Sequence, residues 1–179
     1  MLFYTGKGDK GLSHIGKKKI DKTCLDIESL GALDEVNSFL GVILNQKITA
    51  SNKKIVRGVQ EDLFIIQANI ASLMLGVKKA PAFKQDKVRK LETHINKFER
   101  EVNPKPSFVI SGSTEATAWL DYSRTLARKA EIAMLRLNKK KKVKPDILAY
   151  LNRLSSLLYA MARAETKRAR KKEAHPSYT

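Results

Sequence analysis

The chain has 179 residues, 42% of them hydrophobic and 30% charged, a composition typical of a globular protein with one core. It contains no run of about 20 apolar residues, which excludes a membrane-spanning helix, and its N-terminus does not read as a secretory signal, so a cytoplasmic location is expected. Its 35 Lys and Arg residues against 18 Asp and Glu residues give a formal net charge of +17, which favours an anionic partner without identifying one.

Cysteine and histidine are too sparse to support several kinds of site. Cys24 is the single cysteine, which excludes an internal disulfide and a metal site built from several cysteines. His14, His94 and His175 are far apart in the sequence, so a transition-metal centre is not expected. No serine–histidine or cysteine–histidine nucleophile can be identified either.

The first 23 residues form an arm that holds four of the nine glycines and shows no helical periodicity. Residues 5–11 read TGKGDKG, a loop in which glycines let backbone N–H groups approach a phosphate while lysines add charge. The loop does not match the P-loop pattern, because no GK[ST] opens a helix after a strand. A flexible arm with no ligand has the same composition, so both interpretations stay open at this point.

Five segments with helical periodicity follow the arm, joined by connections of about 4–12 residues. They cover residues 25–46, 51–75, 85–103, 108–137 after an extended start and a break at 111–113, and 145–166. Their predicted inward stripes are Leu33, Val36, Leu40 and Ile43; Ile55, Val59, Leu63, Ile66, Ile70 and Leu73; Val88, Leu91, Ile95 and Phe98; Trp119, Tyr122, Leu126, Ala133 and Leu137; and Ile147, Leu151, Leu154, Leu158 and Met161.

Capping and breaking residues mark several of the predicted helix ends. Ser51 can cap the second helix and Gly76 can end it, while Pro104 ends the third helix and Pro145 suits the first turn of the fifth. No segment alternates with period two over a useful length. We therefore predict an all-α bundle in which residues 1–179 form a single domain, with an arm at 1–23 and a basic tail at 167–179.

Polar side chains on two of the helices are candidates for binding. Asp121, Arg124, Arg128 and Glu131 recur at helical spacing and place four charges along one stripe. Spacing alone favours a solvated face, but two arginines flanked by carboxylates can also clamp a polyphosphate. Asn152 interrupts a good helix-forming segment, and it is either a ligand-binding side chain or an exposed or back-bonded asparagine.

Several short motifs occur in a fixed order over nearly the whole chain. They are YTGKGDKG at 4–11, Lys22 followed by Glu28, GALDEVN at 31–37, FVI at 108–110, the Arg124, Arg128 and Glu131 group, and YLNRLS at 150–155. One such motif is a weak signal, whereas the set at consistent spacings resembles the PduO-type ATP:cob(I)alamin adenosyltransferases. The resemblance implies a ferritin-like five-helix bundle, assembled as a homotrimer with active sites between neighbouring subunits.

The same resemblance implies an activity and a set of site residues. The reaction would transfer the 5′-deoxyadenosyl group of ATP, with Mg²⁺, to the cobalt of cob(I)alamin, giving adenosylcobalamin and triphosphate. Asp34 would pair with Arg124 across the subunit interface, Arg128 would act on the triphosphate, and Phe108 would line the corrin face and keep the lower axial ligand off. The residues implied to hold ATP are Thr5, Gly6, Lys7, Gly8, Ser13, Lys22, Arg128, Glu131 and Asn152.

Three positions depart from the family pattern. The family usually has Pro-Gly-Gly where this chain has Ser-Gly-Ser at 111–113, a histidine at the place of Asp121, and an arginine at the place of Ile132. The first departure would loosen the turn behind Phe108, and the second would place an extra carboxylate near Arg124. The third removes a charge that would otherwise bind phosphate.

Two alternative functions remain. The departures are compatible with a family member that binds ATP or corrinoid without turnover. The basic clusters at 16–22, 138–144 and 167–172 are compatible with a helical protein that binds nucleic acid. Aromatic residues do not interleave with these clusters and no recognition-helix motif is present, so the sequence favours the enzyme.

Overall fold

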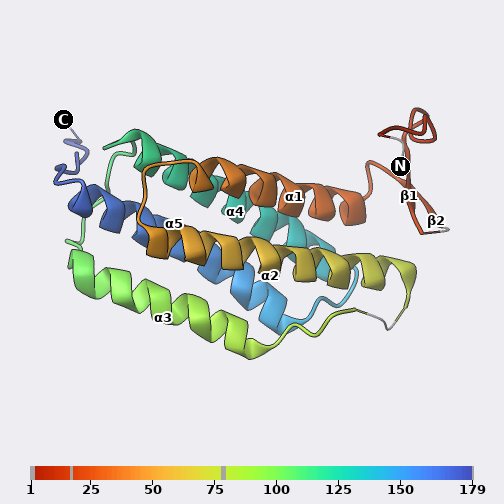
Figure 1. Cartoon of the computed structure of the whole chain (residues 1–179). Coiled ribbons are helices and arrows are strands. Elements are labelled where there is room, and N and C mark those ends of the chain that lie inside the picture. Colours follow the sequence, from red (N-terminus) through yellow and green to blue (C-terminus); the bar gives the residue numbers. More distant parts are fainter. Residues whose placement is uncertain (1–2, 17, 78–79, 179) are drawn as a thin grey trace.

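The five predicted helices pack side by side in an elongated bundle, and the N-terminal arm projects from one end (Figure 1). The computed structural model describes residues 3–16, 18–77 and 80–178, so the first two residues of the predicted arm, Lys17 of the first basic cluster and Thr179 of the tail lie outside the described residues. The helices are α1 (Leu25–Leu44), α2 (Ala50–Leu75), α3 (Gln85–Val102), α4 (Glu115–Asn138) and α5 (Pro145–Arg168). The prediction of an all-α, five-helix bundle is confirmed.

The main helix contacts follow the order α2, α1, α4, α5, α3. The helix α4 contacts both α1 and α5, while α3 packs on α5 and α2 packs on α1. In Figure 1 the arm lies at the end where α1 begins, and the C-terminus lies at the opposite end. Within the described ranges, every helix is too short or too polar to cross a membrane.

The arm contains regular structure that was not expected from the sequence. β1 (Leu12–Ile15) and β2 (Lys18–Asp21) form an antiparallel hairpin, so the prediction of a wholly irregular arm is wrong for these residues. Each strand has only four residues, too few for an alternation of apolar and polar side chains to be recognised. Ile15 and Ile20, one from each strand, pack against the core and attach the hairpin to the bundle.

Most predicted helix ends are correct within two residues. Gly76 ends α2 in the left-handed conformation at φ +70°, and Pro145 occupies the first turn of α5, both as predicted. The cap of α2 is Thr49 rather than Ser51, because the Thr49 side chain accepts a hydrogen bond from the Asn52 N–H at 3.3 Å. Ser51 already lies inside the first turn.

The core confirms three of the five predicted stripes completely. The stripes of α1, α3 and α5 are buried at every position. In α2 the middle of the stripe is buried, but Val56 and Met74 take the core positions predicted for Ile55 and Leu73.

The stripe of α4 is wrong at its N-terminal end. Trp119 is 37% exposed and Tyr122 is 49% exposed, and both rings pack against Phe39 on the surface of α1. The buried side of α4 is built largely from small residues, which let α1 and α5 approach closely: Ala116, Ala127, Ala130 and Ala133. Alanines contribute little to a hydrophobic pattern, so the larger aromatic side chains gave the wrong face.

Candidate functional site

The glycine-rich loop and Lys22 form one compact group at the arm end of the bundle. The Lys22 Nζ donates a hydrogen bond to the Gly8 carbonyl at 2.9 Å, and the Lys22 N–H donates to the Gly11 carbonyl at 2.9 Å. A Cβ on residue 8 would lie 2.9 Å from that same Nζ, so a larger residue there would displace the flexible end of the Lys22 side chain. Thr5 Oγ1 accepts from the Lys7 N–H at 3.5 Å within the loop. The structure thus brings together the predicted ATP residues at 5–8 and 22.

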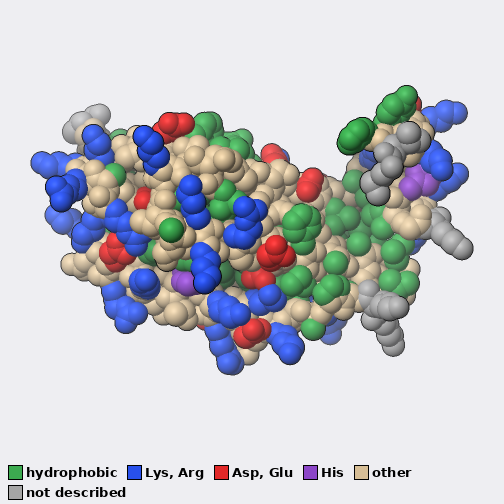
Figure 2. All heavy atoms as spheres, viewed as in Figure 1, with side chains coloured by type: hydrophobic (Ala, Val, Ile, Leu, Met, Phe, Trp, Pro, Cys, Tyr) green, Lys and Arg blue, Asp and Glu red, His purple; other side chains and the backbone are tan. Residues whose placement is uncertain are grey.

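The hairpin carries Ser13 to the edge of a groove between α1 and α2. Lys18 attaches the hairpin to the end of α2, since its Nζ donates to the Met74 carbonyl at 3.0 Å. The groove encloses about 520 Å³ and is lined by Ser13, Asp34 and Phe64, together with apolar residues of both helices. Figure 2 shows hydrophobic side chains gathered over α1 and α2 beside the arm. Phe64 is 59% exposed there, which is unusual for a large aromatic ring in an isolated chain.

The predicted charged stripe of α4 divides into two parts with different surroundings. Asp121 is buried and forms a 2.5 Å ion pair with Arg163 of α5, whereas its Oδ1 lies 3.9 Å from the Arg124 Nε. A solvated face is therefore wrong for Asp121. Arg124 and Arg128 line a cavity of about 650 Å³ between α1 and α4 and a second of about 320 Å³ bounded by α3, α4 and α5.

The acidic residues of the first cavity are already paired with cations other than these two arginines. Glu35 accepts a 2.7 Å bond from Lys129, which raises the pKa of the Lys129 amine above its usual value. Glu28 pairs with Arg136 at 3.4 Å. Within the described part of the chain, Arg128 has no hydrogen-bonding or ion-pair partner, so its guanidinium is available to an anion.

Glu131 and Asn152, distant in sequence, meet at the surface between α4 and α5. The Asn152 Nδ2 donates to Glu131 Oε1 at 2.8 Å, and Arg153 donates to Asn152 Oδ1 at 2.5 Å. Asn152 is exposed, but its side-chain amide bonds to the side chains of Glu131 and Arg153 and not to the backbone of its own helix. Glu131 lies one helical turn beyond Arg128, so these three predicted site residues form one group.

Within one chain, Phe108 and Asp34 lie apart from the glycine-rich loop and from the group of Arg128, Glu131 and Asn152. Phe108 precedes α4 at the end opposite the arm, and its side chain is 76% exposed. Asp34 faces the α1–α2 groove, and among the described contacts none joins it to Arg124. The structure therefore shows the predicted residues as separate groups: the glycine-rich loop with Lys22, Ser13 and Asp34 at the α1–α2 groove, the α4–α5 group, and Phe108.

Three residues that line the second cavity were not recognised as candidate site residues from the sequence. Phe98 and Tyr159 give it aromatic walls, and Arg163 lies over the Tyr159 ring at 5.0 Å from its centroid. Arg163 is only 4% exposed, and an arginine among apolar residues of α5 is the signal that indicates such a site. Among the described residues, no group of three or more His, Cys, Asp or Glu side chains is placed to bind a metal ion.

Ile132, which stands where the family usually has an arginine, lines the same cavity as Arg128. It is 48% exposed and lines the α1–α4 cavity together with Lys129 and Arg136. Both neighbouring cations are engaged by glutamates, so an arginine missing at 132 leaves Arg128 and Arg124 as the cations that can bind a ligand in this cavity.

Known proteins are similar to this chain over nearly its whole length. A family model described as cobalamin adenosyltransferase matches residues 3–165. The chain is 33% identical to the corrinoid adenosyltransferase PduO of Salmonella typhimurium, covering 92% of this chain and 50% of that protein, so it spans about half the length of that relative. It is 30% identical to a corrinoid adenosyltransferase of Bacillus subtilis, covering 94% of this chain and 89% of the relative.

Solved structures agree with the sequence relatives. A variant PduO-type ATP:corrinoid adenosyltransferase from Lactobacillus reuteri, complexed with cobalamin and ATP, superimposes with a TM-score of 0.92 at 26% identity, covering 98% of this chain and 99% of that one. Another variant of that enzyme, complexed with ATP, gives a TM-score of 0.87 at 26% identity, covering 97% and 99% of the two chains. The chain described here belongs to the cobalamin adenosyltransferase family.

Proposed function

We propose that this protein transfers the 5′-deoxyadenosyl group of ATP to the cobalt of a reduced corrinoid, cob(I)alamin, giving adenosylcobalamin and triphosphate. Family membership and the similarity to enzymes complexed with cobalamin and ATP support the proposal. The observation that carries it is Arg128, whose guanidinium has no partner among the described residues and lies one turn from the Glu131–Asn152 pair. Because the reaction consumes ATP, the proposal includes a cytoplasmic location.

The proposed reaction needs no nucleophilic side chain from the protein. Co(I) supplies the electron pair that forms the bond to the C5′ carbon of ATP, while the C5′–O bond breaks and its electrons leave with triphosphate. The protein must therefore hold the two substrates in line and stabilise negative charge on the leaving group. In this proposal Arg128, Lys7 and Lys22 perform the second task. This requirement fits a site whose charged groups include an arginine and two lysines.

Mg²⁺ fits the same site without a dedicated protein cage. This ion is commonly held by phosphate oxygens and water with one or two carboxylates. Glu131 is the carboxylate beside Arg128, and its other oxygen is not engaged by Asn152. The ion would neutralise part of the triphosphate charge, while Arg128 and the arm lysines fix the orientation of the chain of phosphates.

We also propose that the complete site lies between subunits of a homotrimer. The α4 helix has 24 residues and is about 36 Å long, so the arm at one end and Phe108 at the other cannot contact one small ligand within a single chain. In the proposed trimer the arm of one subunit covers the α4–α5 group of the next. Asp34, exposed in a groove beside Phe64, then pairs with Arg124 of that neighbour.

In this proposal the corrin ring lies beside Phe108. The cavity with Phe98 and Tyr159 in its walls offers apolar surface to a flat macrocycle, and Pro104 in its rim begins the loop that carries Phe108. In the proposal, Phe108 occupies the lower axial side of cobalt and excludes water or a base there. A cobalt without that ligand is easier to reduce to the nucleophilic state.

The deciding experiment is an anaerobic assay with ATP and chemically reduced cobalamin, read from the visible spectrum of the cobalt–carbon product. Arg128→Ala should lower turnover by about 100-fold or more, because an aligned cation is lost where charge develops. Arg136→Ala is the matched control, since it removes an arginine of the same helix that already pairs with Glu28, and it should stay near wild type.

Three results would reject parts of this proposal. Normal turnover by Arg128→Ala would show that the triphosphate is held elsewhere. A wild-type protein that forms no product, yet binds RNA tightly in a manner that collapses with added salt, would favour the nucleic-acid alternative. Tight binding of ATP and corrinoid without product would instead favour a non-catalytic member of the family.

A further inference from the structure

The tail segment, residues 169–178, folds back onto the stretch that carries Phe108. The Ile110 N–H donates to the Ala174 carbonyl at 2.8 Å, which forms an isolated antiparallel bridge. The His175 Nδ1 lies 2.8 Å from the Phe108 carbonyl oxygen and 3.2 Å from Ser107 Oγ. Two consecutive tail residues therefore hold three of the four residues from 107 to 110.

These contacts define which ring nitrogen of His175 carries a proton. A carbonyl oxygen can only accept, so Nδ1 must carry a proton in order to bond Phe108. Ser107 Oγ then accepts a share of the same hydrogen. Both the neutral tautomer with the proton on Nδ1 and the imidazolium can donate this bond.

A buried ion cluster attaches the tail segment to the bundle. Arg163 is 4% exposed, and it bonds Asp121 Oδ2 at 2.5 Å and faces Glu173 Oε1 at 3.4 Å. A guanidinium inside the protein needs counter-charges, since an uncompensated buried charge costs several kcal/mol. The cluster therefore draws Glu173 inward and places Ala174 and His175 next to the Phe108 stretch.

The position of Phe108 has no other evident source of order. Its side chain is 76% exposed, so packing of the ring does not fix it. The turn behind it reads Ser-Gly-Ser at 111–113, with Gly112 at φ +105°, and it lacks a proline that would restrict the backbone. Apart from the bond of the Ser107 N–H to the nearby Lys105 carbonyl at 2.8 Å, the described hydrogen bonds that fix 107–110 from outside the segment come from the tail.

We infer that His175 and Glu173 are positioning residues, which fix the backbone of 107–110 and thereby set where Phe108 meets the corrin ring. The role of Phe108 in this inference rests on the proposed function, whereas the tail contacts do not. Asp121, which departs from the family pattern, then has a defined task in this chain: it is the main counter-charge of Arg163 and so supports the anchor of the tail.

The test uses the full chain and combines two readouts. His175→Ala removes the donor to Phe108, His175→Asn retains an N–H donor at the position of Nδ1, and Lys172→Ala is a control on an exposed tail residue. Hydrogen exchange of the Ile110 amide reports the tail contact whether or not the enzyme is active. Steady-state kinetics with corrinoid and ATP varied separately report the effect on Phe108.

His175→Ala should accelerate exchange at Ile110 and raise the KM for corrinoid by about 3- to 10-fold, the loss expected for one hydrogen bond. The KM for ATP should stay unchanged, His175→Asn should restore most of the loss, and Lys172→Ala should match wild type. The visible spectrum of bound Co(II) corrinoid should also shift toward the form that retains its lower axial ligand. Glu173→Gln should act in the same direction.

A double variant separates positioning from general loosening. If His175 acts through Phe108, then Phe108→Ala combined with His175→Ala should be no worse than Phe108→Ala alone. Unchanged exchange at Ile110 in His175→Ala would overturn the inference whatever the activity. Faster exchange with an unchanged corrinoid KM, or additive losses in the double variant, would overturn the positioning role. A wild-type protein without product would instead reject the proposed function.

Discussion

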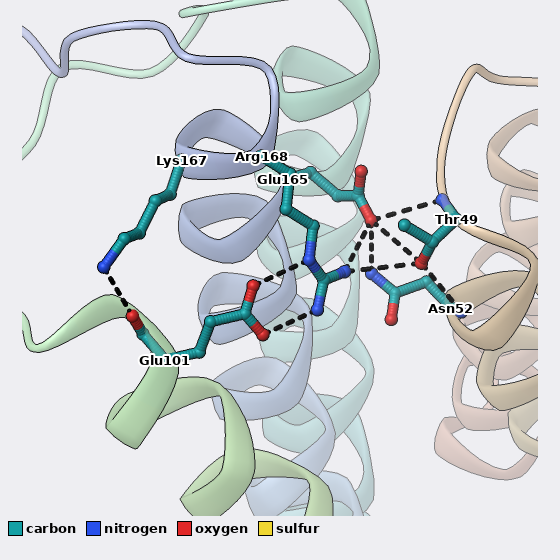
Figure 3. Close-up of polar contacts among 6 residues, drawn as sticks. All are labelled: Thr49, Asn52, Glu101, Glu165, Lys167 and Arg168. Carbon is teal, nitrogen blue, oxygen red and sulfur yellow. Dashed lines mark hydrogen bonds and ion pairs between the residues drawn. The ribbon is translucent and has the colours of Figure 1, made fainter.

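Replacing Glu165 should cost this protein more stability than any exposed acidic residue on the helices. Figure 3 shows its carboxylate at the junction of three helix ends, where Oε1 accepts from the N–H and Oγ1 of Thr49, from Asn52 and from Arg168. The Asn52 bond is 2.6 Å long and both side chains are buried. Arg168 in turn donates to both oxygens of Glu101, at 2.7 and 2.6 Å.

The expected magnitude follows from what each group loses. Glu165→Ala leaves the buried Asn52 Nδ2 without an acceptor, which costs about 1–3 kcal/mol. The first turn of α2 also loses a carboxylate, worth about 0.3–1 kcal/mol. Arg168 retains its ion pair with Glu101, so the loss of its bond to Glu165 adds little to the cost. We therefore expect Glu165→Ala to lower the free energy of unfolding by about 3 kcal/mol, and Glu165→Gln, which keeps an acceptor oxygen without charge, by about 1 kcal/mol.

Guanidinium chloride unfolding followed by circular dichroism measures both values, at one protein concentration because subunit association shifts the midpoint. Glu61→Ala, which removes an exposed glutamate of α2, is the matched control and should stay within about 0.5 kcal/mol of wild type. A loss below about 0.5 kcal/mol for Glu165→Ala would refute the reasoning, since the junction would then contribute no more than a surface residue. Equal losses for the Ala and Gln variants would refute the role given to the acceptor oxygen.

Three further predictions concern buried or half-buried polar groups. Burial and Asp62 raise the pKa of Tyr150 well above its usual value, and Tyr150→Phe should cost about 1 kcal/mol in the same assay, because the 3.0 Å bond to Asp62 is lost. Burial lowers the pKa of His94 below 6.5, so its neutral form is favoured in the fold. Stability should be full above pH 6.5 and decline as the pH falls through that value, and a His94→Gln variant should show a smaller decline. Asp121→His restores the usual family residue but removes the main counter-charge of the buried Arg163, and should cost about 3 kcal/mol. Adding Arg163→Met should recover part of that loss, and no recovery would show that the two residues act independently.

The helices were predictable because their signals are local. Apolar residues recur every three to four positions, and Gly76 and Pro145 mark helix ends by their own backbone preferences. The N-terminal part of the α4 stripe was not, because Trp119 and Tyr122 lie outside while smaller side chains such as Ala116 take the buried side. Local patterns report the size of side chains, but contact between helices depends on how closely two backbones can approach.

The candidate site shows the same division between local and distant information. The glycine-rich loop was visible as a motif, and Lys22 reaches it across the hairpin. The pair of Asp121 and Arg163 joins residues 42 positions apart, so charge patterning along one helix could not reveal it. Glu131 and Asn152 were placed together by the family resemblance, and their 2.8 Å bond agrees with that placement.

The junction around Glu165 also constrains the order in which this chain can fold. The bonds of Glu165 and Arg168 to Thr49 and Asn52 join residues 113 to 119 positions apart, and those of Arg168 to Glu101 join residues 67 apart, so none of these can form until α5 has been synthesised. The same holds for α3, whose apolar stripe packs against α5. A nascent chain that ends before residue 145 can pair α1 with α2 and with α4, but it must leave the stripe of α3 in water. Completion of the bundle is therefore a late, long-range step, and the interval before α5 emerges is when the chain is most exposed to aggregation.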